Sequence, residues 1–223
     1  MIGKGKSISH GVAALEYDLA KEINGQAVAT EIARHELYGC TGAEMVQEMK
    51  PYHIDFPNVK NNCLRFEVSP SIEESATFTD ADWAELGNDF MQRMGLANHQ
   101  YIIIRHSGTE SKKEQAHLHI LANRVSLSGE LYRDNWIGKK ATEAANAIAK
   151  ERNFVQSQDI GKVNKAEIKE AMDGVLKKMQ GFDFTKFKEE LGKRGFKVRE
   201  ARASTGKPVS YTHLRAHETC ADL

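Results

Sequence analysis

The pattern of apolar and polar positions predicts short strands interspersed with amphipathic helices. Apolar runs, the second of them strongly β-branched, predict strands over residues 62–68, 101–105 and 116–125. Residues 31–38 fit a strand or a helix, and residues 69–76 are expected to form a loop.

Helices are predicted where apolar residues recur every three or four positions. Thr41 and Glu44 have the spacing of a capping box and predict a helix that ends at Met49, before Pro51. A second helix is expected to begin at Thr79 and to end near Gly95. Further helices are predicted over 12–23, 135–152, 164–179 (capped by Asn164) and 184–192, and a strand over 196–201.

Two of the predicted strands carry three histidines. The strands over 101–105 and 116–125 are separated by polar residues and are expected to form a hairpin. Alternate side chains of a strand share a face, so His117 and His119 point the same way, and His106 meets them if the connecting loop folds back. Three neutral imidazoles can hold a divalent cation with an open position for a phosphoryl oxygen. One such histidine alone is more often a core or surface group, but three in one hairpin predict a metal site.

The order of the predicted elements suits an α+β fold. We expect an antiparallel β-sheet with helices packed on one face, and the histidine triad with its metal on the open face. An open groove on such a sheet accepts a single strand of nucleic acid better than a duplex. Tyr132 and Trp136 could stack bases at its edge, at about 1 to 3 kcal/mol per base, or Trp136 could only anchor the following helix.

Several motifs occur in a fixed order. His106 is followed by His117, a hydrophobic residue, His119 and then Asn123 in the same strand. The opening MIGKGKSISH precedes a tyrosine, LRFEVSPSIEES precedes a helix, and NRV precedes an alanine-rich helix. Through about residue 155, this order resembles that of the relaxases, the mobilization nucleases of conjugative and mobilizable elements. One departure is Gly108, where the family often carries Asp.

The resemblance implies an enzyme that nicks one DNA strand at a transfer origin. It places Tyr17 as the nucleophile and His106, His117 and His119 as ligands of a divalent metal, Mn²⁺ or Mg²⁺. The tyrosine oxygen would attack the scissile phosphate to give a 5′-phosphotyrosyl link and a free 3′ hydroxyl. A phenol with an ordinary pKa near roughly 10 needs help from a nearby cation or base. His10 is a weaker rival nucleophile and better suits a local or phosphate contact.

Other interpretations of the same residues stay open. Val12, Leu15, Leu19 and Ile23 form an apolar stripe beside Tyr17, and this spacing favours a packing role for the tyrosine. The histidines would then activate water in a metal-dependent hydrolase. A rolling-circle replication initiator shares the relaxase chemistry but acts at a replication origin. A non-catalytic DNA-binding accessory protein would use the histidines structurally.

The resemblance also implies partners. Single-stranded DNA at a transfer origin is expected, together with relaxosome accessory proteins and a coupling protein, and no membrane insertion. The expected DNA contacts are Lys4, Lys6, Arg105, Asn123 and Arg124. The net charge is zero, but residues 139–200 hold 15 Lys and Arg against 10 Asp and Glu, while residues 1–100 hold 8 against 15. The basic C-terminal half could therefore supply phosphate contacts or simply be a set of solvated helix faces.

The last residues differ in kind from the rest. VSYTHLRAHETCADL, residues 209–223, resembles a translated sequencing adapter, so His213, His217 and Cys220 are excluded as ligands. We therefore expect a relaxase domain over 1–180 and the start of a truncated α/β unit over 181–208. The remaining cysteines, Cys40 and Cys63, match no metal-ligand spacing, and no signal peptide or bilayer-length apolar run is visible, which favours the cytoplasm.

Overall fold

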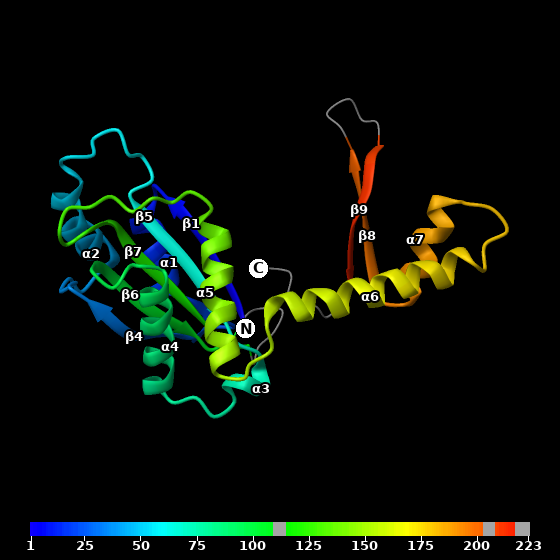
Figure 1. The fold of residues 1–223 in the computed structure, drawn as a ribbon, viewed down its shortest axis with the longest axis horizontal. Coiled ribbons are helices and arrows are strands. Elements are labelled where there is room, and N and C mark those ends of the chain that lie inside the picture. Colours follow the sequence, from blue (N-terminus) through cyan, green and yellow to red (C-terminus); the bar gives the residue numbers. More distant parts are fainter. Residues whose placement is uncertain (109–114, 203–207, 217–223) are drawn as a thin grey trace. The chain divides into compact units, whose positions relative to one another are not determined.

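A five-stranded antiparallel sheet organises the first of two compact units. The computed structural model describes residues 1–108, 115–202 and 208–216, and its first unit covers Met1–Ser157. The strand order is β1-β5-β7-β6-β4 (Figure 1), and each neighbouring pair is antiparallel. The strands are β1 (Ile2–Ile8), β4 (Ala29–His35), β5 (Cys63–Ser69), β6 (His99–His106) and β7 (His117–Ser126). The expected α+β fold is confirmed.

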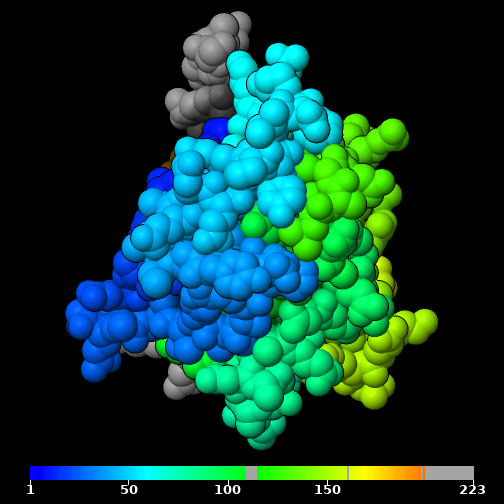
Figure 2. Space-filling model, turned by 90° about the vertical axis from the view of Figure 1, so that its left-hand side faces the viewer, coloured from blue at the N-terminus to red at the C-terminus, as the bar shows by residue number. Residues whose placement is uncertain are grey.

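Helices lie on both faces of this sheet (Figure 1). On one face α4 (Asp80–Arg93) and α5 (Ile137–Glu151) enclose the larger core. On the other face α1 (Gly11–Leu19) and α2 (Gly42–Met49) enclose a smaller one. Figure 2 looks onto the β4 and α2 side of this unit, where blue and light-blue residues lie between cyan residues above and green residues below. The structure thus adds partial helical cover to the face that was expected to be open.

The interior strands β6 and β7 contribute to both cores. Ile103 of β6 and Leu118 of β7 point into the larger core, while Ile104 and Leu121 point into the smaller one. Burial on both faces explains why these strands read as nearly continuous apolar runs instead of alternating ones. His117 and His119 share the odd-numbered face of β7 with Leu121, so the histidines border the smaller core.

Close contact between α5 and the edge strand β1 depends on a glycine. A Cβ atom at Gly3 would lie 2.5 Å from the carbonyl oxygen of Ala141 and 2.6 Å from the Cβ of Ala145. No side chain fits in that space, so only glycine allows the helix to approach the strand.

The helix that carries Tyr17 is shorter than predicted. The sequence predicts a helix over 12–23, but α1 ends at Leu19 and a small hairpin of β2 (Glu22–Ile23) and β3 (Gln26–Ala27) follows. Asn24 and Gly25 form its turn with φ angles of 53° and 75°. An Asn-Gly pair favours this tight turn, and it overrides the helical spacing of the apolar residues.

Other predicted elements form with small differences. Residues 31–38, which fitted two structures, lie mostly in the strand β4. The loop expected over 69–76 contains the short helix α3 (Ile72–Ser75), because Ser71 and Glu74 form a capping box. The capping box at Thr41 and the helix start at Thr79 are confirmed, and Thr79 also forms a capping box, with Asp82. The 3-10 helix η1 (Lys50–His53) follows α2.

The second unit, Gln158–Leu223, has its own small core. Its elements are α6 (Ser157–Leu176), α7 (Phe184–Lys193), β8 (Phe196–Arg202) and β9 (Pro208–Ala216), and β8 pairs with β9. α6 begins seven residues before the predicted cap, so Asn164 lies inside the helix. The two compact units divide at residue 157, because apolar residues of α6 pack with α7 and β8; a relaxase domain that extends to residue 180 stays a prediction. That residues 209–223 are an adapter translation stays a prediction, and His217 and Cys220 lie outside the described residues.

Candidate active site

The three predicted histidines meet on one face of the sheet. His106 ends β6 and lies directly across from His117 in the register of β6 and β7, and His119 follows two residues on. Their candidate ligand atoms all lie within 4.8 Å of one another, and the side chains are buried, with 2, 4 and 7% exposed. The loop expected to join the two strands includes residues 109–114, which lie outside the described part of the chain.

Two of the rings are oriented by backbone carbonyl groups. His117 Nδ1 lies 3.2 Å from the carbonyl oxygen of Gln115, and His106 Nε2 lies 2.7 Å from that of Asp18. A carbonyl oxygen can only accept a hydrogen bond, so these ring nitrogens donate. The lone pairs of His117 Nε2 and His106 Nδ1 therefore remain for a metal ion.

Charged side chains lie around the third ring, that of His119. Arg65 donates to Nδ1 of His119 at 3.2 Å. Nε2 of His119 lies 3.1 Å from Nε2 of His117. A metal ion on His119 Nε2 would require the proton on Nδ1, where it needs an acceptor. Oxygens of Asp18 and Glu67 both lie 3.9 Å from Nδ1. Both distances exceed hydrogen-bond range, and Nδ1 accepts from Arg65 here, so the ring or the guanidinium would have to move before either carboxylate could accept that proton.

The electrostatics of the site suit metal ligands. Burial is the main cause that lowers the pKa of His106, His117 and His119. The positive charges of Arg65 and Lys21 lower the pKa of His106 and His119 further. The imidazoles are therefore neutral at neutral pH, which is the protonation state that binds a cation. Three converging, buried and neutral nitrogens fit a divalent metal.

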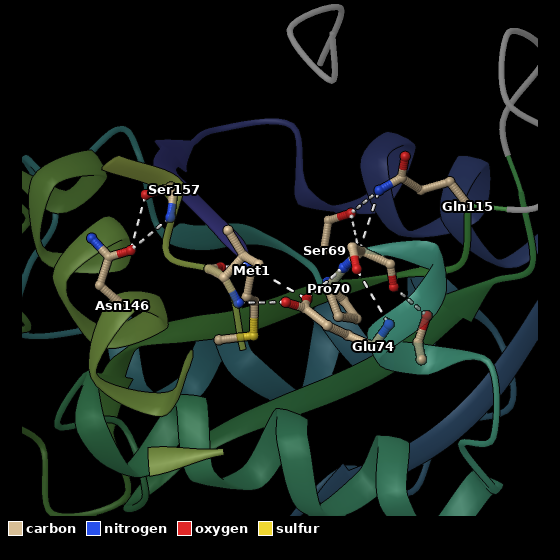
Figure 3. A network of polar contacts seen from close by, with 10 residues as sticks. Met1, Ser69, Pro70, Glu74, Gln115, Asn146 and Ser157 are labelled. Atoms are coloured by element: carbon tan, nitrogen blue, oxygen red, sulfur yellow. Dashed lines mark hydrogen bonds and ion pairs between the residues drawn. The ribbon is translucent and has the colours of Figure 1, made fainter. Parts of the chain in front are cut away.

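A polar network holds the segment that leads into β7. The buried side-chain amide of Gln115 donates to the hydroxyl of Ser69 at 3.1 Å and to the carbonyl oxygen of Pro70 at 3.3 Å (Figure 3). The backbone carbonyl of the same glutamine accepts from His117. Gln115 thus links the end of β5 to the orientation of a candidate metal ligand.

The predicted nucleophile lies on α1, close to the triad in the fold. Tyr17 is 56% exposed, and its hydroxyl oxygen accepts a hydrogen bond of 2.6 Å from Lys21 Nζ. The backbone carbonyl oxygen of the next residue, Asp18, accepts a hydrogen bond from His106. The carboxylate of Asp18 accepts two hydrogen bonds from Arg65, of 2.5 and 3.0 Å. α1 is therefore fastened to the triad one residue away from the tyrosine. Of the stripe expected to bury Tyr17, Leu15 is buried but Val12 is exposed, and the phenol faces solvent.

The predicted DNA contacts divide by face. Lys4 and Lys6 of β1 lie opposite Glu67 and Arg65 of β5, on the face that carries the triad. Arg105 and Arg124 lie on the opposite face, in ion pairs with carboxylates of Asp80 and Asp134. The structure thus brings the lysines toward the triad and leaves the two arginines away from it.

Asn123 differs from its expected role, and one of the two alternatives for Trp136 is excluded. The side chain of Asn123 is fully buried; its amide donates to Gln100, and its oxygen faces His53 Nε2 at 2.7 Å. Asn123 therefore links β6 and β7 to η1, and its side chain is not exposed for contact with DNA. Trp136 is 80% exposed, so it does not anchor α5, whereas the next residue, Ile137, is buried. Base stacking by Trp136 stays a prediction.

Sequence reasoning missed the charged residues around the triad. Asp18, Lys21, Arg65 and Glu67 were not singled out, although all four lie close to Tyr17 or His119. One signal was present, because Arg65 and Glu67 alternate with the apolar residues of β5 and must share a face. Which face that is depends on the pairing of β5 with β7.

Comparison with known proteins identifies the family. The model of the relaxase family, described as MobA/VirD2-like nuclease domain, matches residues 17–154. This match covers more than half of the chain, and the chain therefore belongs to the relaxase nuclease family. No curated protein sequence matches it.

Two solved structures are distantly similar. The first is the conjugative relaxase TrwC in complex with oriT DNA in a metal-bound form, with 12% identity, a TM-score of 0.41, and coverage of 92% of this chain and 74% of that one. The second is a copper-bound structure of the same complex, with 13% identity, a TM-score of 0.27, and coverage of 92% and 64%.

In residues 1–108, 115–202 and 208–216, every helix is too short or too polar to cross a bilayer.

Proposed function

We propose that this relaxase nicks one DNA strand at a transfer origin through Tyr17. The observation that supports the proposal is the link between α1 and the triad: Asp18, the residue after Tyr17, binds both His106 and Arg65, and the phenol of Tyr17 on the same helix is exposed. A packing residue would be buried, whereas this one is accessible to a substrate.

His106, His117 and His119 would hold a divalent cation, Mn²⁺ or Mg²⁺, that stabilises charge on a non-bridging phosphate oxygen when bound. The bond-making and bond-breaking steps use Tyr17. The Tyr17 oxygen attacks phosphorus, the bond to the 3′ oxygen breaks, and a 5′-phosphotyrosyl link forms. Because the bond energy is kept in this link, the same tyrosine can be displaced when the strand is resealed.

Single-stranded DNA is the proposed substrate. Lys4 and Lys6 would contact its phosphates, since β1 runs beside β5 on the triad face, and the triad lies on β7 and β6, the next two strands. Relaxosome accessory proteins and a coupling protein would be the partners of such an enzyme, as the family resemblance implies.

The test uses the full chain with Mn²⁺ and 3′-labelled single-stranded oligonucleotides that tile the DNA around its gene. A labelled protein–DNA adduct on a denaturing gel is expected. The adduct should be lost with Tyr17→Phe and kept with Tyr38→Phe, a control at another exposed tyrosine. Cleavage without an adduct, unchanged in Tyr17→Phe, would overturn the proposal in favour of a metal-dependent hydrolase.

A further inference from the structure

Lys21 is the side chain that touches the proposed reacting atom. Its Nζ donates to the Tyr17 hydroxyl oxygen at 2.6 Å and lies 4.8 Å from the centre of the ring. The two residues are four apart, with Tyr17 in the last turns of α1 and Lys21 just after the helix ends. The ammonium group therefore contacts both the oxygen and the ring of an exposed phenol.

The backbone fixes the position of Lys21. Helix α1 ends at Leu19, and β2 begins at Glu22, so the lysine stands between two regular elements. Its carbonyl oxygen accepts a hydrogen bond of 3.0 Å from the backbone of Val28, which closes the small β2–β3 hairpin. The backbone of Lys21 is thus held by a hydrogen bond, and its side chain is half-buried.

The charge of Lys21 also reaches the triad. It contributes to the lowered pKa of both His106 and His119. The ammonium group therefore lies within electrostatic range of the imidazoles as well as in contact with the phenol. A phosphate between Tyr17 and the triad would meet this positive charge on its approach.

We propose that Lys21 is a catalytic residue that holds the Tyr17 oxygen and stabilises its negative charge as it attacks and leaves. This inference rests on the proposed function. In the forward step the phenol proton passes to bulk water, the oxygen–phosphorus bond forms, and the 3′ oxygen departs and takes a proton from water. In resealing the 3′ oxygen attacks and the phenolate leaves, again facing the ammonium group. A protonated lysine can only donate, so it acts as a charge and not as the base.

The experiment measures single-turnover nicking and resealing by the full chain, with DNA affinity measured separately in the absence of metal. Lys21→Met should slow both directions by about 10- to 100-fold, since removal of one charge-stabilising donor has effects of this order or larger. Its affinity for uncleaved DNA should stay within about threefold, because contacts in the ground state are kept. Lys21→Arg should retain most of the rate. Lys162→Met, at an exposed lysine of α6, is the matched control and should behave as wild type.

Chemical rescue separates catalysis from a structural role. Added methylammonium should restore part of the rate of Lys21→Ala, but it would do nothing for a misfolded variant. A Lys21→Met variant that nicks at the wild-type rate, or whose lost rate is explained by lost DNA affinity, would overturn the inference and leave the role of Tyr17 intact. Absence of an adduct with the wild-type chain would instead remove the proposed function itself.

Discussion

The buried ion pair between Asp18 and Arg65 allows a quantitative prediction. The carboxylate of Asp18 is 2% exposed and makes two hydrogen bonds to the guanidinium of Arg65, which is 15% exposed. Asp18→Ala would leave this guanidinium with only a ring nitrogen of His119 as a partner in the described contacts. Removal of one partner of a buried pair costs about 3 to 5 kcal/mol, and the residual exposure of Arg65 favours the lower end, about 3 kcal/mol.

Urea unfolding followed by tryptophan fluorescence measures this loss. The chain has two tryptophans, Trp83 and Trp136, and both lie in the first unit, so the signal reports on that unit. With a denaturant dependence of about 2 kcal/mol per molar urea, the midpoint should fall by about 1.5 M. The control Glu85→Ala removes the exposed partner of Arg152 and should cost less than about 1 kcal/mol.

A double variant identifies the cause of the loss. Asp18→Ala combined with Arg65→Met removes both charges and should recover much of the stability, because the unpaired charge is what costs free energy. A loss below about 1 kcal/mol for Asp18→Ala alone would refute the reasoning, since water would then satisfy the guanidinium. A double variant no more stable than the single one would assign the loss to packing instead.

The remaining predictions concern the metal, pH and packing. Asp18→Asn should weaken Mn²⁺ binding by about 10-fold, and His117→Ala by more than about 100-fold, in calorimetric titrations; equal affinities would place the metal elsewhere. Burial holds the pKa of the three triad histidines below the usual 6.5, so the unfolded chain binds more protons than the folded one below this pH. The free energy of unfolding should therefore fall as the pH drops from about 7.5 to about 5.5, and a flat or rising urea midpoint would contradict this. Gly3→Ala should cost about 1 to 3 kcal/mol, because its Cβ would lie 2.5 Å from a carbonyl oxygen of α5. Gly138→Ala, with 3.5 Å to its nearest neighbour, should be neutral or stabilising in the same urea assay, and equal losses would refute the packing argument.

Local sequence patterns predict most of the helices and strands and the three histidine ligands. Alternation places His117 and His119 on one face of any strand that contains them, and the capping boxes at Thr41 and Thr79 begin their helices through local hydrogen bonds. These features depend on residues within a few positions of one another. The family resemblance added Tyr17, whose exposure agrees with a role at the surface.

The charged groups around the triad are brought together by the tertiary fold. Asp18, Arg65 and His119 are far apart in sequence, and they meet because β5 pairs with β7 and α1 packs over the same face. Alternation along β6 and β7 puts Arg105 and Arg124 on the opposite face, although they are neighbours of the triad along the chain. A one-residue step along a strand reverses the direction of a side chain, so sequence proximity to a site does not decide whether a residue reaches it. Strand register and helix packing do.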